Sequence, residues 1–407
     1  SNWTEMGSSI STLSRTIPKI LYAVEGSRIS ETSVEIKWVV SEKNPVDGLA
    51  IWEEGTTEEK QISLEDASAG QYTITGLTPR TTYYVALTNS AAPEGAEKYN
   101  QQRFTTAGMP ADAVVVEDGV DLMDKIKAGM DDTSKQALVF QLKNGVDYYL
   151  TTGGEVAAKT GDIKLTKSIA LLANPGERPT LYIREGGFIV KPEVGNMPNI
   201  EYFIVDNVNI KETWTESKPS KGSKTRLLNI GKHNTGTDFT IDRFEITNSD
   251  IVLPSAVLMM SDASEGVTTI NHIRIDNCLV SGINTSAVTK QFGFIHAINK
   301  GSNVWNDVSV TNSTFYEFYI SPGVFGAPTA DVPIAAGNKV VISNCTFYNW
   351  GSNKDGKNTY RAVGNFSKLT TPLNLSVSNC VFGSSKSKVL DAGSINLNSK
   401  GNYCTSD

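Results

Sequence analysis

Short runs of alternating apolar and polar residues, separated by turn-forming residues, dominate the first quarter of this chain. In SVEIKW, Val34, Ile36 and Trp38 fall on one face. A side-chain period of two is that of a half-buried β-strand. The runs GLAIWEE, QYTITGL and TTYYVALTNS continue in the same way. The pattern therefore predicts short β-strands from about Ile17 to about Thr106.

A different pattern governs the rest of the chain, where one apolar-polar phrase with a central Asn recurs. Its copies read FIVDNVNI, FEITNSDI, IRIDNCLV, VSVTNSTF, VVISNCTF and LSVSNCVF, with a degraded copy in NSKGNYCT. The central Asn falls at positions 207, 248, 277, 312, 344, 379 and 402. Recurrence at a loose period of this size indicates stacked structural units.

The units themselves are rich in strand signals and poor in helical ones, which excludes ankyrin-like and leucine-rich arrangements. Propeller blades would need four hairpin-linked strands in each repeat, with their own turn signals. Here each phrase is followed by a variable polar loop and a second apolar strand, such as RLLNI, AVLMM, GFIHAI or KVLDA. Three short strands per coil, stacked in register, predict a right-handed parallel β-helix.

The side-chain parity inside the phrase predicts a bend at the Asn. In VSVTNSTF, Val308 and Val310 share one face, and Ser313 and Phe315 share one face, but the parity changes between the two pairs. Both pairs point inward only if the chain bends near Asn312. Asn adopts the left-handed backbone of such a bend at a lower cost than most residues. Stacked Asn amides are then expected to bond one another as a ladder.

The position after each Asn carries a small residue that we expect to fill the core. These residues are Val208, Ser249, Cys278, Ser313, Cys345 and Cys380. The remaining cysteine is Cys404, and no C-x-x-C pair occurs. The sequence therefore predicts neither a zinc site nor a disulfide scaffold, and the cysteines are interpreted as core filler rather than reactive groups.

Between the two patterns lies one amphipathic stretch. In DGVDLMDKIKAGM, apolar residues recur at helical spacing at Val120, Leu122, Met123, Ile126 and Met130. This pattern predicts a helix that caps the open core of the coil. The predicted organisation is a tail over 1–16, a first domain over 17–107, a linker over 108–117 and the β-helix over 118–407. The fold class is all-β.

Composition narrows the partners. The chain has 407 residues with 20% charged residues and a net charge of -7. Phosphate binding needs concentrated Lys and Arg, so nucleic acid is not expected as a partner. No apolar run approaches the ~20 residues of a membrane-spanning helix. The chain starts at Ser1 and shows no signal peptide, which we interpret as a mature chain whose export signal has been removed.

One segment of the first domain carries a specific motif. In GLTPRTTYYVAL, the residues Leu77, Pro79, Thr81, Tyr83 and Val85 resemble the L-x-P-x-T-x-Y-x-V motif of fibronectin type III domains. The resemblance implies a β-sandwich in which the Tyr hydroxyl bonds nearby backbone and Trp38 lies in the core. We interpret this domain as a spacer. The alternative, a ligand-binding module, lacks an exposed aromatic cluster.

The whole chain also has a resemblance. A fibronectin type III domain ahead of a coil containing GDIKLTKSIALLANPGERPTLYI is similar to pectate-lyase-like β-helix proteins of Bacteroidetes glycan-utilisation systems. The resemblance implies a polysaccharide partner, such as pectin or another uronan. It also implies export to the outer cell surface, lipid anchoring upstream of Ser1, and outer-membrane glycan-uptake components as partners. A monomer is expected.

Lyase chemistry on such a fold needs a basic side chain, and often Ca²⁺ held by carboxylates, to remove a proton next to a carboxylate. Aligning the second strands gives candidate bases or substrate clamps at Lys232, His296, Lys300 and Arg361. Candidate Ca²⁺ ligands are Asp262, Glu265 and Asp391. Against this reading, no dense Asp/Glu cluster appears, and RPTLYIR departs from the R-x-P-x-x-R pattern of the lyases. A solvated polar face is the alternative interpretation.

Other hydrolytic chemistries find less support. Glycoside hydrolases need two carboxylates at a controlled separation, and no such pair occurs within a coil strand. His233, His272 and His296 fall in different coils without a G-x-S-x-G motif, so Ser-His-Asp hydrolysis is not predicted.

Aromatic residues give a separate route to sugars, because flat rings stack on the apolar faces of pyranoses. Phe315 and Phe347 occupy equivalent repeat positions and are predicted to be core. The candidate carbohydrate-binding residues are Tyr316, Tyr319, Tyr348, Trp350 and Tyr360. The alternative is that these side chains pack loops onto the coil.

Three functions thus stay open from the sequence. The first is polysaccharide binding at the cell surface, with the coil as the binding floor. The second is a polysaccharide lyase acting by β-elimination on an acidic glycan, with Ca²⁺. The third is a structural or adhesive surface protein.

Overall fold

The structure is a computed structural model of the chain. It describes residues 19–150, 163–183, 187–212, 226–231, 237–254, 257–262, 266–283, 292–298, 302–320, 322–326, 339–350, 360–366, 373–383, 388–391 and 395–405. The chain divides into two compact units. Of the described residues, one unit contains those from Lys19 to Asp112 together with Ala173–Arg178, and the other contains Ala113–Leu172 and those from Pro179 onward.

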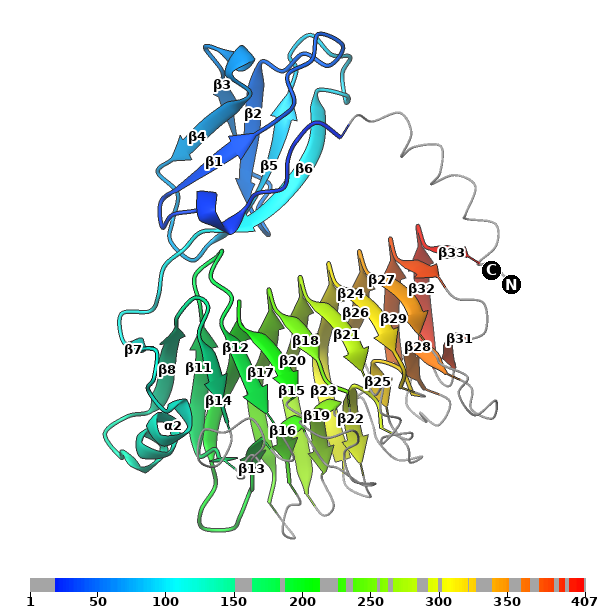
Figure 1. Cartoon of the computed structure of the whole chain (residues 1–407). Coiled ribbons are helices and arrows are strands. Elements are labelled where there is room, and N and C mark those ends of the chain that lie inside the picture. Colours follow the sequence, from blue (N-terminus) through cyan, green and yellow to red (C-terminus); the bar gives the residue numbers. More distant parts are fainter. Residues whose placement is uncertain are drawn as a thin grey trace. The chain divides into compact units, whose positions relative to one another are not determined.

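The first unit is built from two antiparallel sheets (Figure 1). One sheet pairs β1 (Ser33–Lys37) with β4 (Gln71–Thr75). The other has the order β3 (Glu59–Ser63), β2 (Gly48–Glu53), β5 (Thr82–Thr88) and β6 (Lys98–Thr105). Two short 3₁₀ helices, η1 (Gly26–Arg28) and η2 (Ala67–Ala69), lie in the connections.

The predicted core of this unit is confirmed. Val34, Ile36 and Trp38 are buried in one cluster with residues of both sheets. The hydroxyl of Tyr83 accepts a hydrogen bond from the backbone N–H of Thr78 at 3.1 Å, as the motif implied. Two antiparallel sheets around one core are what a sandwich requires, whereas membership of the fibronectin type III class stays a prediction.

One helix, α2 (Leu122–Asp131), lies where the second unit begins. Its N-terminus is capped by Asp121, whose side chain accepts from the N–H of Asp124 at 3.2 Å. Leu122, Met123 and Ile126 are buried as predicted. At the other end, Lys167 Nζ donates to the carbonyl oxygens of Gly129 (3.1 Å) and Asp132 (2.7 Å). The helix packs on β8 and β9, the first strands of the coil.

The rest of the second unit is a stack of parallel strands in three sheets, seen from green to red in Figure 1. In the described residues the largest sheet has ten strands: β7 (Val114–Val116), β8 (Ala137–Leu142), β11 (Lys167–Leu172), β14 (Asn199–Asp206), β17 (Phe239–Thr247), β20 (Val267–Asp276), β23 (Ser302–Thr311), β26 (Lys339–Ser343), β29 (Leu373–Ser378) and β32 (Ile395–Lys400).

The second sheet follows the first across the Asn bend and has nine strands in the described residues. They are β9 (Asp147–Tyr149), β12 (Thr180–Ile183), β15 (Asn209–Glu212), β18 (Asp250–Val252), β21 (Leu279–Ile283), β24 (Thr314–Phe318), β27 (Thr346–Trp350), β30 (Val381–Gly383) and β33 (Tyr403–Thr405).

The third sheet completes each coil, with eight strands in the part of the chain that the structure describes. They are β10 (Ile163–Lys164), β13 (Phe188–Val190), β16 (Arg226–Ile230), β19 (Val257–Asp262), β22 (Ile295–Ile298), β25 (Phe325–Gly326), β28 (Arg361–Asn365) and β31 (Lys388–Asp391). Every strand pairs in parallel with its counterpart one coil away, which confirms the parallel β-helix. The coil winds to the right, which is the hand that connections between parallel strands of one sheet adopt.

The interior of the coil is filled by columns of equivalent apolar side chains. Phe315 stacks on Phe347 with ring centroids 4.7 Å apart, and Phe347 stacks on Phe382 at 5.2 Å. All three rings are buried. Phe203 and Phe244 form a similar stack at 5.6 Å in earlier coils. The prediction that Phe315 and Phe347 are core residues is confirmed.

The Asn bend is confirmed as the joint between the ten-stranded and nine-stranded sheets. Six of the predicted Asn residues have left-handed φ angles between 51° and 59°: Asn207, Asn248, Asn277, Asn312, Asn344 and Asn379. Each of their backbone N–H groups donates to a carbonyl of the following coil; that of Asn312, for example, donates to Ser343 at 3.1 Å. The bends therefore lie on top of one another.

The side-chain ladder at the bend differs in part from the prediction. Asn277 Nδ2 donates to Asn248 Oδ1 at 2.8 Å, as expected for stacked amides. Asn248 and Asn312 instead donate to the carboxylates of Asp206 (2.8 Å) and Asp276 (2.9 Å) in the preceding coil. A carboxylate one residue before the bend is the stronger acceptor, so it replaces an amide wherever the sequence provides one.

The last copy of the phrase aligns one residue away from the prediction. Gly401 takes the left-handed conformation, with φ 68°, and Asn402 occupies the position of the small core residue. The Asn402 side chain accepts from the N–H of Cys380 at 2.9 Å and donates to the carbonyl of Val377 at 2.8 Å. Cys278, Cys345 and Cys380 are buried free thiols, which confirms their role as core filler.

Candidate functional site

The sequence-predicted base His296 lies in β22 with its side chain fully buried. Its Nδ1 accepts the backbone N–H of Gly293 at 2.9 Å, and the ring of Phe292 meets it edge-on at 4.8 Å. Burial, and next the charge of Arg226, lowers the pKa of His296 to about 3. The imidazole is therefore neutral and enclosed by the protein.

The predicted clamp Arg361 and the predicted Ca²⁺ ligand Asp391 are brought together. Arg361 Nε lies 2.6 Å from Asp391 Oδ2, and Lys388 Nζ lies 3.2 Å from Asp391 Oδ1. Although burial raises the pKa of Asp391, these two cations hold it below its usual range. Both carboxylate oxygens are thus engaged by basic side chains, and Asp391 acts in this structure as an ion-pair partner.

The other predicted catalytic and metal residues receive no side-chain description. Lys232, Lys300 and Glu265 lie outside the described residues. Asp262 ends β19, and only its backbone belongs to the described part. Within the described residues, no group of three or more His, Cys, Asp or Glu side chains could hold a metal ion. Ca²⁺ therefore stays a prediction.

Among the predicted carbohydrate-binding residues, Tyr316 and Tyr348 form one exposed pair. They are cross-strand neighbours on β24 and β27, with ring centroids 5.8 Å apart and an angle of 5° between the ring planes. The exposed fractions are 38% for Tyr316 and 55% for Tyr348. The structure thus places a stack of two flat rings on the outer face of the nine-stranded sheet.

A row of residues with left-handed backbone supplies polar groups beside this pair. Gly282, Glu317 and Asn349 occupy equivalent places in β21, β24 and β27, and all three have left-handed φ angles between 50° and 61°. The left-handed backbone shifts the side-chain alternation by one residue, so that Glu317 and Asn349 follow the exposed tyrosines without turning fully inward. Tyr319 is half-buried next to them, and its hydroxyl accepts from Asn349 Nδ2 at 3.2 Å.

The left-handed backbone of Asn349 also explains why Trp350 does not join the pair. Simple alternation after Tyr348 would turn position 350 outward, but the left-handed Asn349 shifts the parity by one. The indole of Trp350 is therefore only 2% exposed and packs edge-on against Phe382 at 6.1 Å. Trp350 is thus a core residue and not part of the exposed aromatic surface that the sequence predicted. Tyr360 is half-buried at the start of β28 and lies apart from the tyrosine pair in the strand order.

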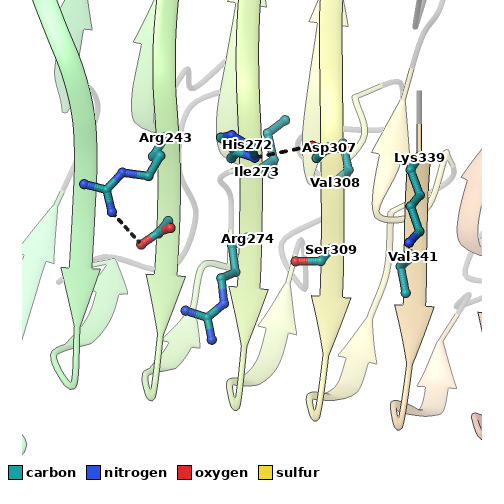
Figure 2. A pocket seen from close by; sticks show the side chains of 10 residues that line it. Arg243, His272, Ile273, Arg274, Asp307, Val308, Ser309, Lys339 and Val341 are labelled. Atoms are coloured by element: carbon teal, nitrogen blue, oxygen red, sulfur yellow. Dashed lines mark ion pairs between the residues drawn. The ribbon is translucent and has the colours of Figure 1, made fainter. Parts of the chain in front are cut away.

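A second surface, which the sequence reasoning missed, is a groove of about 530 Å³ on the outer face of the ten-stranded sheet (Figure 2). Cross-strand register aligns its polar side chains in two columns. One column runs through Arg243, His272, Asp307 and Lys339 on β17, β20, β23 and β26. The other runs through Glu245, Arg274, Ser309 and Val341 on the same strands.

The charges in this groove largely pair with one another. His272 Nδ1 lies 3.6 Å from Asp307 Oδ2, and Arg243 Nη1 lies 3.8 Å from Glu245 Oε2 (Figure 2). Arg274 Nη2 lies 3.2 Å from Asp276 Oδ2 at the groove's edge. Among the described residues, Lys339 makes no ion pair. The groove thus combines one His–carboxylate pair with three permanent cations.

The sequence did contain a signal for the groove residues, because they are the outward positions of the repeated phrase. In FEITNSDI, IRIDNCLV and VSVTNSTF, the second letter gives Glu245, Arg274 and Ser309. Aligning the residues before each phrase would have given Arg243, His272 and Asp307 as well. The bases predicted from the sequence lie on the second strands instead, and His272 was named only among the histidines that form no hydrolase triad.

Comparison with known proteins adds little to this picture. No family model matches the chain, and no curated protein matches it. Among solved structures, a Family 28 exopolygalacturonase of Yersinia enterocolitica aligns with 96% of this chain and 99% of its own, at 11% identity and a TM-score of 0.19. A superposition of that quality supports no argument, so the parallel β-helix rests on the strand pairing described above.

Proposed function

We propose that the β-helix binds a polysaccharide and that Tyr316 and Tyr348 form a contact point for its sugar rings. The observation that carries the proposal is the parallel, exposed arrangement of these two side chains on adjacent strands. Exposed aromatic rings held rigidly by a sheet offer large apolar area at a small cost in side-chain entropy.

The residues around the pair leave ring surface open. The register partner of Tyr316 on its other side is Ser281, and that of Tyr348 is Gly383. Both are small, so the outward-looking faces of the stack are not covered by a neighbouring side chain of the column. Glu317, Asn349 and the Tyr319 hydroxyl lie alongside and are suited to bond sugar hydroxyl groups.

Affinity electrophoresis tests this function. The protein is run through gels containing polygalacturonan, xylan, mixed-linkage β-glucan or mannan, and retardation is compared with that in an empty gel. The Tyr316→Ala/Tyr348→Ala variant is expected to lose most of the retardation seen for the parent. Tyr72→Ala, which removes a ring of similar exposure from the first unit, is the matched control. Equal mobility of the parent in every gel would contradict the proposal.

A second candidate function is β-elimination on an acidic glycan, which the groove on the ten-stranded sheet favours. His272 beside Asp307 is an accessible basic side chain, and Lys339, which makes no ion pair among the described residues, is placed to neutralise a uronate carboxylate. In such a step His272 takes the proton next to the carboxylate. The glycosidic C–O bond then breaks, a carbon–carbon double bond forms, and the leaving oxygen takes a proton from water.

The lyase reading makes a direct spectroscopic prediction. Incubation with polygalacturonan, with and without Ca²⁺, is followed for the ultraviolet absorbance of an unsaturated product. A signal that disappears in His272→Gln and persists in Tyr316→Ala would assign catalysis to the groove. Without any signal across a panel of uronans, the binding function stands as the better reading. A protein that neither retains a glycan nor cleaves one would instead fit the structural or adhesive role.

We further propose that the chain works at the outer cell surface, held by a lipid and in company with outer-membrane glycan-uptake components. The first unit then serves as a spacer. Within the described residues, no helix is long and apolar enough to cross a membrane. Protease treatment of intact cells tests the location, since a surface protein is digested while an internal one is protected.

A further inference from the structure

A second pair of tyrosines lies on the same outer face as Tyr316 and Tyr348. Tyr149 on β9 and Tyr182 on β12 are cross-strand neighbours, with ring centroids 5.0 Å apart and 13° between the ring planes. Both rings are half-buried. Burial, and next the charge of Asp147, raises the pKa of each hydroxyl, so both stay protonated hydrogen-bond donors.

Strand register puts the two pairs in one column. From Tyr182 the parallel pairing leads to Lys211, Val252 and Ser281, and then to Tyr316. Four strand spacings of about 4.8 Å separate Tyr182 from Tyr316, or about 19 Å along the helix axis. No aromatic side chain interrupts the column between the pairs.

The surface between the two tyrosine pairs carries polar and small residues. Lys211, Val252 and Ser281 are half-buried, and the residues shrink in size toward Tyr316. The neighbouring column, two residues earlier on each strand, carries Thr180, which is buried, followed by Asn209, Asp250 and Leu279. Amide, carboxylate and ammonium groups therefore lie on or beside a strip that has a flat ring at each end.

We propose that Tyr149, Tyr182, Lys211, Val252, Ser281, Tyr316 and Tyr348 form one axial binding strip for an extended saccharide chain. The chain lies parallel to the helix axis, stacks sugar rings on both tyrosine pairs, and bonds the polar groups between them. This inference rests on the proposed polysaccharide binding and adds a second contact point, a direction and a minimum length for the ligand.

The length of the ligand is what the strip predicts most sharply. A chain that spans both pairs gains from each of them, because the second contact forms within the same complex. A di- or trisaccharide is too short to bridge about 19 Å and contacts one pair at a time. Loss of Tyr149 and Tyr182 should therefore weaken long chains and leave the contact of short saccharides at Tyr316 and Tyr348 in place.

The experiment compares three variants with the parent: Tyr149→Ala/Tyr182→Ala, Tyr316→Ala/Tyr348→Ala, and the variant lacking all four rings. The first probe is polygalacturonan or, failing retention there, whichever polymer of the panel above retards the parent. The second probe is the di- and trisaccharide of the same sugar, measured by calorimetry. Each pair removed should raise the polymer dissociation constant about threefold to tenfold. The short saccharides should still bind at whichever pair remains, and they should lose binding only in the variant lacking all four rings.

The outcomes separate the strip from the function on which it rests. Polymer binding that survives loss of Tyr149 and Tyr182 but falls with Tyr316 and Tyr348 overturns the strip and keeps the proposed function. A parent that binds no polymer of the panel overturns both. Thermal melts check folding, and Tyr182→Leu keeps an apolar side chain without a flat ring, so a loss of binding in this variant cannot be assigned to misfolding.

Discussion

Two neighbouring residues of β27 show how one kind of contact serves two purposes. Phe347 points into the coil and Tyr348 points out, and each stacks on its counterpart in β24, with ring planes 6° and 5° from parallel. Phe347 is fully buried, whereas Tyr348 is 55% exposed. The inner stack removes apolar area from water and holds the coils together. The outer stack keeps a free face, which a ligand can cover.

The largest expected effect comes from the inner stack. Phe347→Ala opens a cavity between Phe315 and Phe382, two buried rings that cannot collapse onto it without moving the strands. We expect a loss of about 3–5 kcal/mol in the free energy of unfolding. Urea denaturation measures it, with Phe347→Leu as the control that keeps most of the volume. If Phe347→Ala lowered the free energy of unfolding no more than Tyr348→Ala does, the inner stack would not stabilise the coil more than the outer stack.

Protonation of a buried side chain should also lower the stability of the coil, and His296 provides the test. Its pKa in the folded protein, about 3, lies below the 6.5 of an unperturbed histidine. The unfolded state therefore binds more protons below pH 6.5, and stability is lost as pH falls from there toward 3. Between pH 7 and pH 4 this single group should cost about 3 kcal/mol.

His296→Gln separates this contribution from the carboxylates that also titrate in acid. The variant should start from a lower stability at pH 7 and lose less of it on acidification than the parent. Parallel stability curves for the two proteins between pH 7 and pH 4 would show that His296 is not held neutral by burial.

The Asn bends between the ten-stranded and nine-stranded sheets predict a smaller effect on stability. Asn344 has a φ of 53° and its backbone N–H donates to Ser378, while its side chain is exposed. Asn344→Ala should cost about 1–2 kcal/mol, because a β-carbon is strained in the left-handed region. Asn344→Gly removes that strain and should cost less than Asn344→Ala in the same denaturation series. The reverse order would mean that the bend does not depend on backbone conformation.

The outer stack should contribute least to stability. Tyr348→Ala removes a half-exposed ring and one stacking contact, so we expect a change of under about 1 kcal/mol in the free energy of unfolding. The same variant is expected to reduce glycan retention severalfold. A variant that unfolds as readily as Phe347→Ala would show that Tyr348 holds the coil together, and its loss of binding would then be uninformative.

Much of the coil was predictable because its evidence is local and repeated. The Asn of each phrase marks a left-handed bend, the small residue after it fills the core, and Phe315 and Phe347 follow as equivalent inward positions. Each of these predictions needs only the order of residues within one copy. The repetition supports these predictions, because equivalent positions of stacked coils must carry residues that suit the same environment.

The candidate site was harder to predict because it depends on register and on small departures from regularity. Trp350 turned inward because Asn349 adopts a left-handed conformation that alternation does not reveal. Gly401, rather than Asn402, adopts the left-handed conformation of the final bend. The sequence alignment of this copy was off by one residue, and that shift exchanges the bend position with the buried position that follows it. The Arg361–Asp391 pair joins two coils across a loop of variable length, so no spacing rule within a strand finds it.

The one-residue-per-coil columns have a consequence for how such a protein changes over generations. Duplication of one coil adds a single position to every column at once, including the column that carries the four tyrosines. The separation between the tyrosine pairs would then grow by one fixed step while each pair kept its own geometry. Duplication of one coil-encoding segment of the gene would in this way fit the binding strip to a longer sugar chain without a new binding site.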